Sequence, residues 1–339
     1  MIPHNKPTLG KEEEDAALRV IHSKQLAQSD EVESFENEFC NFIGLPEGHA
    51  VAFSSGTSSL FVSLWVLNAT GKKILFPNYV CSALRHAVGM INGNEVLLDN
   101  ENNSPNLDIE QLKTIQHDIQ IIPHMYGIPI RINQNTHSSI IEDCCQALGA
   151  KVDNNFVGMQ GDVGFFSFYA TKLITSGGQG GMVVSKNKDL VERMKDYREF
   201  DMRHDKKKRF NFQMTDLQAA IGREQLKKLP SFIKRREEIF QLYKKSGLEL
   251  LDVKQKDESS LKPVRFRAIM RTNNPTQIIT SLSEADIQAI VPTEDWELLG
   301  NQTSFPNSLK LSKETVSLPI YPSLTNEQVN IILSVLVKK

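Results

Sequence analysis

Short apolar segments alternate with helical segments over the first 185 residues, and this alternation constrains the fold more than any other feature. The apolar segments are 50–53, 73–76, 95–99, 119–123, 139–141 and 182–184, and each has the length of a single strand. Helical patterns lie at 11–23 and 31–43 and between several of these segments. Strands that alternate with helices predict a mostly parallel sheet with right-handed crossovers. The predicted fold class is therefore α/β, with ligands gathered at the carboxyl ends of the strands.

The last third of the chain has a different pattern. A helix begins at Thr215 or Asp216, and a separate amphipathic helix is expected over 230–243 with Pro230 in its first turn. After the linker at 245–247 we expect a strand at 264–270, a helix from Pro275, a strand at 287–292 and a helix at 326–337. This pattern predicts a large domain, 1–245, with an N-terminal arm, and a smaller C-terminal α/β domain, 246–339.

Composition excludes several classes of protein. The 339 residues are 40% hydrophobic and 24% charged, as in soluble globular proteins, and a net charge of −2 gives no field for nucleic acid or a membrane. The apolar run 60–67 is too short to cross a bilayer, and the N-terminus lacks the apolar core of a signal peptide. Four cysteines without C-x-x-C spacing favour reduced thiols in a cytoplasmic protein with no metal site. For the adjacent pair Cys144 and Cys145, buried packing is favoured over a redox role.

The stretch 164–181 brings a serine and a lysine to the end of a predicted strand. An aromatic run delivers Ser167 and then Lys172, and a turn with four glycines follows. A lysine desolvated at the end of a buried strand has a lowered pKa and becomes a usable nucleophile. Glycines let the backbone approach a flat ligand closely. The alternative is an ordinary hairpin with a solvated lysine at its tip, and this stretch alone leaves both interpretations open.

A small-residue turn at 54–59 separates a predicted strand from a predicted helix. The free backbone N–H groups at such a helix start form an anion site, although a simple helix cap has the same composition. Several polar or aromatic residues fall at or near predicted strand ends: the turn with Gly56 and Thr57, then Tyr79, His124, Asp143 and Lys172.

Together these residues match what pyridoxal phosphate requires. Its aldehyde needs a lysine, here Lys172, to form a Schiff base, and its pyridinium nitrogen needs a carboxylate, here Asp143, so that the ring acts as an electron sink. Its phosphate needs N–H groups and hydroxyls, as at Gly56 and Thr57, and its ring needs a flat side chain such as Tyr79.

The sequence resembles the DegT/DnrJ/EryC1/StrS family of pyridoxal-phosphate-dependent aminotransferases, many of which aminate nucleotide-linked keto sugars. The resemblance runs from Ile2-Pro3 almost to the end of the chain. It rests on six motifs in the family's order: the turn 54–60, Pro123-His124-Met125-Tyr126-Gly127, the segment 141–150 with Glu142-Asp143 and Gln146, the segment 161–181 with Lys172, Met214-Thr215-Asp216-Leu217-Gln218, and Ser317-Leu318-Pro319-Ile320-Tyr321-Pro322. It implies the aspartate-aminotransferase-like fold (fold type I).

The resemblance also implies roles for individual residues. Lys172 would bind the cofactor and shuttle a proton between substrate and cofactor carbons. The cofactor-binding set implied by the motifs is Gly56, Thr57 and Ser167 at the phosphate, Tyr79 stacked on the ring, Asp143 at the pyridinium nitrogen, Gln146 beside the ring, and Asn211 reaching the phosphate from a partner subunit. A site completed across a two-fold interface makes a homodimer the working unit.

Some segments depart from the family pattern. Lys24-Gln25 and Ser29-Asp30 stand where the family often has Gly-Trp and Gly-Pro, and Gln213 stands in place of a common arginine. The segment 291–296 replaces a frequent H-Y-P-type loop; its Trp296 could line the acceptor pocket, but packing in the small domain is favoured. The basic run 201–209 is interpreted as a solvated loop, with diphosphate binding as the alternative.

The predicted function is transfer of an amino group, with glutamate as donor, to a keto group of a nucleotide-diphosphate-linked sugar. Amination of a non-sugar cyclic ketone such as a keto-inositol is one alternative, and a non-catalytic regulatory protein of the same fold is another. A deoxygenating dehydratase is disfavoured, because relatives with that activity replace the lysine with histidine and this chain has Lys172.

Overall fold

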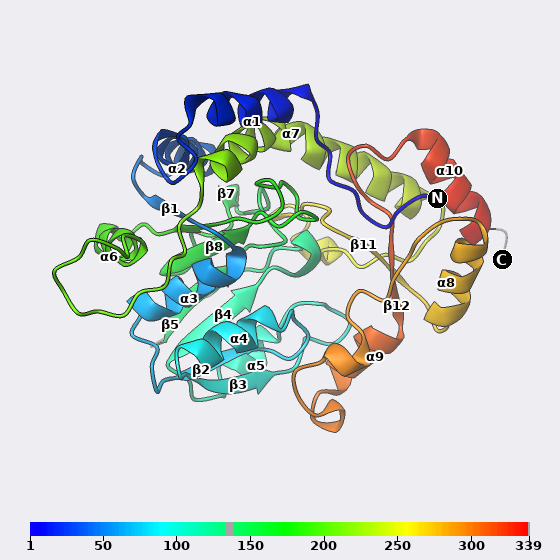
Figure 1. Cartoon of the computed structure of the whole chain (residues 1–339). Coiled ribbons are helices and arrows are strands. Elements are labelled where there is room, and N and C mark those ends of the chain that lie inside the picture. Colours follow the sequence, from blue (N-terminus) through cyan, green and yellow to red (C-terminus); the bar gives the residue numbers. More distant parts are fainter. Residues whose placement is uncertain (133–137, 338–339) are drawn as a thin grey trace.

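A seven-stranded sheet forms the centre of the molecule (Figure 1). The computed structural model describes residues 1–132 and 138–337. The strand order in the sheet is β1-β9-β8-β5-β4-β2-β3. The strands are β1 (Ala50–Phe53), β2 (Lys73–Pro77), β3 (Asn94–Leu98), β4 (Ile119–Pro123), β5 (Ser139–Asp143), β8 (Val163–Ser167) and β9 (Gly181–Val184), close to the segments predicted from the apolar pattern.

Strand direction brings the predicted site residues to one edge. The strands β8, β5, β4, β2 and β3 run parallel to one another, whereas β9 is antiparallel to both β8 and β1. Since β1 is antiparallel to β9, it runs in the same direction as β8. The carboxyl ends of six strands, together with the start of β9, therefore lie at the same edge of the sheet.

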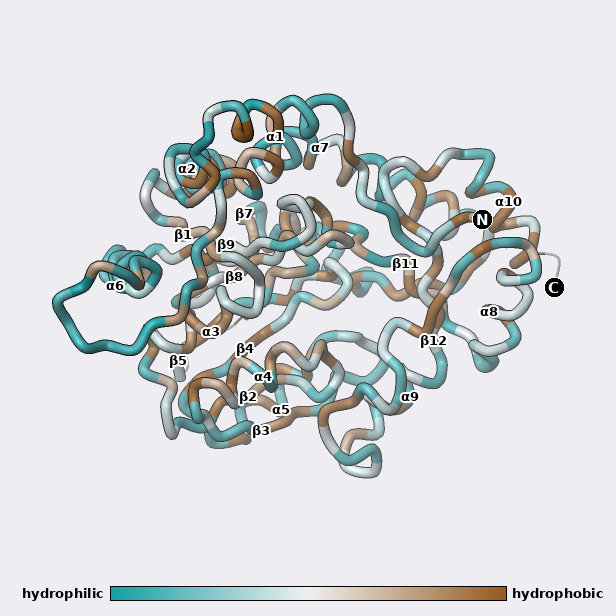
Figure 2. The backbone as a smooth tube through the Cα atoms, viewed as in Figure 1, coloured by the Kyte–Doolittle hydropathy of each residue, from teal (hydrophilic) through white to brown (hydrophobic). Residues whose placement is uncertain are grey.

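Helices cover both faces of this sheet. The strand residues alternate between two cores: Val51 and Phe53 of β1 face one, and Ala50 and Ala52 face the other. Brown, hydrophobic segments of the tube mark these strands between the two layers (Figure 2). The first core contains residues of α3 (Gly56–Val66), α4 (Ala83–Met90) and α6 (Lys188–Arg198), and the second contains residues of α2 (Asp30–Ile43) and α7 (Asp216–Lys245). Helix α1 (Lys11–Ser23) packs on α7 through a small separate cluster. Shorter elements in this part are α5 (Ile109–Leu112), η1 (Met125–Gly127), β6 (Lys151–Val152) and β7 (Asn155–Phe156).

Helix α7 differs from its prediction. Thr215 caps the helix as expected, because its side chain accepts a hydrogen bond from the Gln218 N–H at 3.3 Å. The prediction of a second helix that starts at Pro230 is wrong, since one 30-residue helix continues through that residue. Proline removes one backbone hydrogen bond from a helix, and burial of Leu229 and Phe232 on the same helix opposes a break there.

The C-terminal part contains a two-stranded antiparallel sheet of β11 (Ala268–Arg271) and β12 (Thr315–Leu318), with α8 (Pro275–Glu284) and α10 (Asn326–Leu336) beside it. Its remaining elements are η2 (Gln255–Asp257), β10 (Leu261–Lys262), η3 (Asp295–Glu297), η4 (Gln302–Ser304) and α9 (Pro306–Lys313). A third core joins these elements to Ile2 and to the end of α7. The domain division at residue 245 stays a prediction.

Two strand predictions in this part are wrong. The strand expected at 264–270 begins only at Ala268, because the N–H of Val264 donates to the carbonyl of Gly127 (3.0 Å) instead of to a strand neighbour. The strand expected at 287–292 consists of isolated bridges, Ile287 with Ile2 and Ile290 with Ser317. In both segments, long-range contacts take the place of a sheet ladder.

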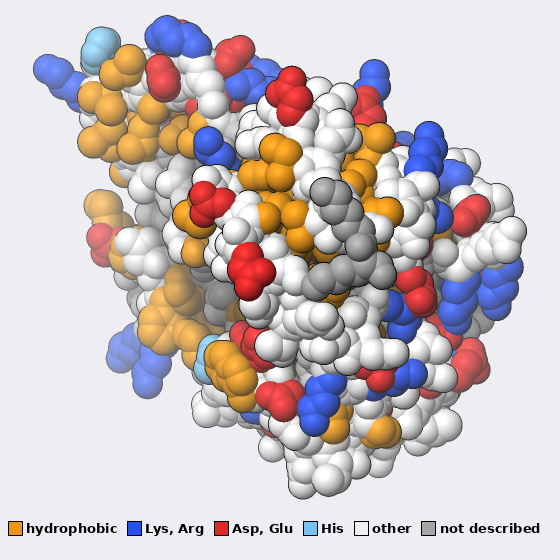
Figure 3. Space-filling model, turned by 90° about the vertical axis from the view of Figure 1, so that its right-hand side faces the viewer, with side chains coloured by type: hydrophobic (Ala, Val, Ile, Leu, Met, Phe, Trp, Pro, Cys, Tyr) orange, Lys and Arg blue, Asp and Glu red, His pale blue; other side chains and the backbone are white. Residues whose placement is uncertain are grey.

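On the face that carries α8 and α10, acidic, basic and hydrophobic side chains are interspersed (Figure 3). Among the residues that the structure describes, no helix has the length and apolar character needed to cross a membrane.

Candidate active site

The turn after β1 forms a compact cradle at the carboxyl edge of the sheet. Ser55 caps α3, with its side chain accepting a hydrogen bond from the Ser58 N–H at 3.1 Å. The first-turn N–H groups of Gly56 and Thr57 have no acceptor within the helix. Ser167, at the end of β8, lies against Gly56 so closely that a Cβ on residue 56 would be 2.7 Å from the Ser167 Cβ and 3.0 Å from its Oγ. The cradle therefore offers backbone N–H groups and a hydroxyl to an anion, at a position where only glycine fits.

Lys172 lies in the connection between β8 and β9. Its side chain is partly buried, and its Nζ lies 5.2 Å from the centre of the Phe266 ring. The carbonyl of the preceding residue, Thr171, accepts a hydrogen bond from the Asn5 Nδ2 at 2.8 Å, so the N-terminal arm runs beside this connection. The lysine lies over a ring from the C-terminal part of the chain, and the N-terminal arm bonds to the residue before it, which is unlike a hairpin tip in solvent.

Asp143 ends β5 and is buried. Burial raises the pKa of its carboxyl group, and the Cys145 N–H (2.9 Å from Oδ1) and the positive charge of Lys172 partly oppose that rise. The carboxylate and the lysine are thus electrostatically coupled. A cationic group placed against Asp143 would stabilise its ionised form.

Glu142, the residue before Asp143, is fixed by several hydrogen bonds. Glu142 is fully buried and accepts hydrogen bonds from His124 (3.1 Å) and from the backbone N–H groups of Gly158 and Gly161 (both 2.9 Å). Burial opposes ionisation of Glu142, but His124 and these N–H groups outweigh it and hold the pKa below its usual range. The Ile130 N–H donates to the other nitrogen of His124 at 3.2 Å, so both ring nitrogens are engaged.

His124, Glu142 and Cys144 are close enough to one another to hold a metal ion. Both histidine nitrogens and the Glu142 oxygens are already engaged in the hydrogen bonds just described, and burial raises the pKa of the Cys144 thiol. A metal would have to displace these bonds and ionise the thiol. We therefore interpret the cluster as a support for the end of β5.

Gln146 and Tyr126 connect two strand ends. The Oε1 of Gln146 accepts a hydrogen bond from the Tyr126 N–H at 2.7 Å, and Tyr126 adopts a left-handed conformation (φ 58°). This bond fixes the Gln146 side chain three residues after Asp143, and its place beside the ring stays a prediction.

Tyr79 does not present a free face in this structure. Its ring is fully buried, meets Tyr126 edge-on, and its hydroxyl accepts a hydrogen bond from the Tyr126 hydroxyl at 2.8 Å. The stacking of Tyr79 on a flat ligand stays a prediction; in this structure the side chain turns inward, where its ring joins the apolar core and its hydroxyl is paired. The exposed side chain in the same turn is that of Cys81.

Three other features singled out in the sequence lie outside the cradle: Asn211, the basic run 201–209 and Trp296. Asn211 is exposed, and its side-chain oxygen accepts a hydrogen bond from the Gln213 N–H at 3.2 Å. In the basic run, Arg209 pairs with Asp196 (2.9 Å) and Asp205 (2.7 Å), while the lysines are exposed, as expected of a solvated loop. Trp296 is 76% exposed, so its interpretation as a packing residue is wrong; the short η3 helix holds it outside the core.

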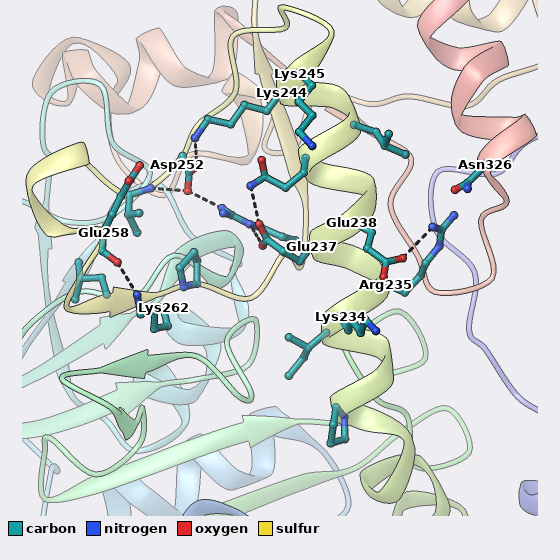
Figure 4. A pocket seen from close by; sticks show the side chains of 18 residues that line it. Lys234, Arg235, Glu237, Glu238, Lys244, Lys245, Asp252, Glu258, Lys262 and Asn326 are labelled. Atoms are coloured by element: carbon teal, nitrogen blue, oxygen red, sulfur yellow. Dashed lines mark hydrogen bonds and ion pairs between the residues drawn. The ribbon is translucent and has the colours of Figure 1, made fainter.

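A groove of about 1090 Å³ along α7 is separate from this edge (Figure 4). Its described lining includes none of the predicted cofactor residues. Its charges are largely paired, as in the bonds of Arg265 to Glu237 (2.7 Å) and to Asp252 (2.6 Å) and of Lys244 to Asp252 (3.0 Å). Paired charges leave little for a ligand to bind, and we do not regard this groove as the active site.

The comparison with known proteins decides the family. The sequence model of the DegT/DnrJ/EryC1/StrS aminotransferase family matches residues 7–337. The chain belongs to this family. Like other DegT/DnrJ/EryC1/StrS proteins, it is a pyridoxal-phosphate-dependent aminotransferase of fold type I, which confirms the predicted fold class, enzyme class and cofactor.

Characterised relatives resemble the chain along its length. It is 27% identical to the GDP-perosamine synthase of Escherichia coli O157:H7, over 97% of this chain and 95% of that protein. It is 29% identical to the UDP-4-amino-4,6-dideoxy-N-acetyl-beta-L-altrosamine transaminase of Helicobacter pylori, over 98% and 96% of the two chains. The crystal structure of the aminotransferase TlmJ from Streptoalloteichus hindustanus has the same fold (TM-score 0.91, 22% identity, 100% and 98% of the two chains).

The residues of this edge fit pyridoxal phosphate. The cradle at Gly56 is free of side chain where an anion would approach, Lys172 is partly buried above Phe266, and the buried Asp143 is suited to a cationic partner. The sequence missed the segments that close the site from the other side: His4 and Asn5 of the arm, Phe266 and Arg267. Charged residues inside an expected strand (Arg265 and Arg267) were the available signal, because a charge is rarely placed in a buried strand without a partner.

Proposed function

We propose that this aminotransferase moves the amino group of glutamate to a keto group of a nucleotide-diphosphate-linked sugar. The observation that carries the proposal is the full-length similarity to enzymes whose names specify nucleotide sugars, the GDP-perosamine synthase and the UDP-linked altrosamine transaminase. The free cysteines of the described chain suit work in the cytoplasm, where thiols stay reduced.

The residues of the edge have distinct tasks in this proposal. When bound, pyridoxal phosphate supplies an electron sink that stabilises negative charge on the carbon next to the transferred nitrogen. Gly56, Thr57 and Ser167 hold its phosphate, and Asp143 keeps its ring nitrogen protonated. Lys172 holds the cofactor covalently in the resting enzyme and moves a proton at its Nζ during transfer.

The supporting residues keep these groups in place. The hydrogen bonds of His124 and two backbone N–H groups to Glu142 fix the end of β5, and with it the direction of Asp143. Gln146 is oriented by the Tyr126 N–H and lies beside the ring.

We further propose a homodimer in which Asn211 of one subunit reaches the phosphate in the other. The support is that Asn211 is exposed, on a loop before α7, and bonds only within its own loop among described residues. A subunit interface over this loop would complete two equivalent sites. Sedimentation of the holoenzyme tests the dimer, and mixing Lys172→Ala with Asn211→Ala subunits tests sharing: partial recovery of activity is expected only if the sites are shared.

A substrate screen tests the acceptor. Purified holoenzyme is incubated with glutamate and a panel of 3-keto and 4-keto nucleotide sugars, with a keto-inositol as the non-sugar comparison, and products are read by mass. We expect an amino sugar nucleotide. Amination of the keto-inositol alone would replace the proposed acceptor, and a colourless protein that binds no pyridoxal phosphate would refute the catalytic proposal altogether.

A further inference from the structure

Arg267 is a cation without an acidic partner. It directly precedes β11 and is partly buried, and no carboxylate of the described chain forms an ion pair with it. Its neighbours in sequence are paired, Arg265 with Glu237 and Asp252, and Arg271 with Glu249 (3.5 Å). Burial lowers the pKa of Arg267, and the nearby Tyr126, Tyr79 and Glu297 only partly oppose this. A buried charge is costly unless it is paired, so this arginine needs an explanation.

Only one nitrogen of Arg267 is engaged. Nη1 donates to the Nε2 of His4 at 3.3 Å and to the Oγ of Ser317 at 3.4 Å, and Ser317 itself lies 2.8 Å from the same histidine nitrogen. Burial, with help from Arg267 and Arg236, lowers the pKa of His4 to about 3, so the histidine is neutral and accepts these bonds. Nε and Nη2 have no partner in the described chain.

These two free nitrogens reach accessible space. The buried polar atoms that lack a partner include Nε of Arg236 and Nε of Arg198, but no atom of Arg267. Arg236 is more enclosed, with 1% of the residue exposed, and its Nη1 donates to three backbone carbonyls. The free edge of Arg267 is therefore open to a ligand.

Arg267 and Lys172 have a common neighbour in the ring of Phe266. The guanidinium carbon of Arg267 is 5.5 Å from the centre of the Phe266 ring, and Nζ of Lys172 is 5.2 Å from the same point. The N-terminal arm gives independent evidence, since His4 contacts Arg267 and the next residue, Asn5, bonds to Thr171 beside Lys172. The guanidinium and the amine thus share Phe266 as a neighbour, and the N-terminal arm contacts both Arg267 and the residue next to Lys172.

We propose that Arg267 binds a carboxylate of the amino donor through its free Nε and Nη2 groups. This assignment rests on the proposed function, in which glutamate is that donor. Two adjacent N–H groups of a guanidinium match the two oxygens of a carboxylate. The amino acid carries a carboxylate on the carbon that bears its nitrogen, so a carboxylate lies near Lys172 whenever that nitrogen does. The diphosphate of the acceptor is separated from its keto group by part of a sugar ring. It would therefore lie farther from Lys172 than the donor carboxylate does.

The test measures binding of two unreactive ligands to holoenzyme by calorimetry: glutarate, a dicarboxylate without an amine, and uridine diphosphate. In Arg267→Met we expect glutarate to bind about 10- to 100-fold more weakly and uridine diphosphate to bind as before. Arg267→Lys, which keeps the charge and loses the paired N–H groups, is expected to fall between the two. Arg271→Met is the matched control, because this arginine ends β11 and pairs with Glu249, so its loss should leave both ligands unaffected.

Each outcome decides the proposal. Unchanged glutarate binding in Arg267→Met, or in Arg267→Lys if the methionine variant does not fold, overturns it, as does weakened binding of uridine diphosphate alone. Wild-type holoenzyme that does not bind glutarate also overturns it. The proposed function fails independently: an enzyme whose glutarate binding depends on Arg267 but which aminates no nucleotide sugar keeps the donor site and loses the acceptor assignment. Cofactor absorbance in every variant separates loss of the donor site from loss of pyridoxal phosphate.

Discussion

The carboxyl edge of the sheet and the segments 264–271 and 287–299 that face it, here called the C-terminal wall, are built in different ways. At the edge, Asp143 and Ser167 are the last residues of strands whose hydrogen-bond ladders fix them. In the wall, residues 268–271 pair with β12, but the other positions depend on single long-range contacts, such as the Val264 N–H to the Gly127 carbonyl and the Leu299 N–H to the Asn78 carbonyl (3.4 Å). The edge is thus suited to constant cofactor chemistry, and the wall to substrate contacts that change without loss of the fold.

Substitution of Lys172 should give the largest loss, because it removes the proton carrier of the edge. In Lys172→Ala we expect the rate of amino transfer to fall by about 10²- to 10⁴-fold, measured as product formed in single-turnover assays. Lys151→Ala is the matched control, since that lysine also lies over a phenylalanine ring (4.3 Å from Phe156) but away from the edge. Equal losses in the two variants would refute the role of Lys172.

Asp143→Asn should separate function from stability. We expect turnover to fall by about 10²- to 10³-fold, since the ring nitrogen loses its anionic partner. Burial raises the pKa of Asp143, so the cofactor-free protein loses stability as pH rises through that pKa and the carboxyl group ionises. The asparagine variant lacks this loss. Melting temperatures of cofactor-free proteins across pH should therefore converge at low pH and favour Asp143→Asn at neutral pH; a variant less stable at every pH would contradict this account.

Gly56→Ala tests the shape of the cradle. The added Cβ would be 2.7 Å from the Ser167 Cβ, so Ser167 must shift away from the phosphate position. We expect a loss of about 1–3 kcal/mol in stability, measured by titration with denaturant. We also expect weaker binding of pyridoxal phosphate, measured by titration with the cofactor. Gly89→Ala, in helix α4 with nothing within 4 Å of its added Cβ, should be neutral or slightly stabilising. Unchanged cofactor affinity in Gly56→Ala would remove this residue from the phosphate site.

His4→Gln probes the wall through its pH dependence. The ordinary pKa of histidine, 6.5, falls to about 3 in the folded protein, because burial and Arg267 disfavour the charged ring. Folding stability from this group is complete above pH 6.5 and is lost as pH falls toward 3. The glutamine variant should show a shallower loss of melting temperature in that window. Identical pH profiles would show that His4 is accessible to protons in the folded state.

Trp296→Ala should have the smallest effect on the fold. A side chain that is 76% exposed contributes little to stability, so we expect a change within about 0.5 kcal/mol by denaturant unfolding. A larger loss would restore the packing interpretation. An unchanged fold with a raised KM for the acceptor would place Trp296 at the acceptor pocket.

The same contrast explains which features could be predicted from the sequence. Residues of the edge follow directly after apolar runs, and parallel strands bring such positions together, so the sequence pattern alone groups Gly56, Asp143, Ser167 and Lys172. The fold class followed from the same alternation. Tyr79 shows where this reasoning ends: its position after a strand is readable, but whether its ring faces a ligand or Tyr126 depends on packing.

The wall could not be predicted in this way. The segments 264–267 and 287–292 have the apolar pattern of strands in the sequence. In the structure they are held by contacts with residues distant in sequence, such as Gly127 and Ile2. The prediction of a separate helix beginning at Pro230 was wrong for a related reason, because tertiary packing keeps α7 continuous at this proline. Arg265 and Arg267 lie in the same sequence pattern. Only the structure shows that Arg265 forms ion pairs with carboxylates and that Arg267 forms none among the described residues.

The central claim is that Lys172 holds the cofactor at this edge, and chemical trapping tests it most directly. Holoenzyme is reduced with borohydride, digested, and the peptides are read by mass spectrometry. The account predicts the reduced cofactor on the peptide that contains Lys172, and its disappearance when glutamate is added before reduction. Cofactor mass on another lysine, or on no peptide of a protein that binds pyridoxal phosphate, would contradict it.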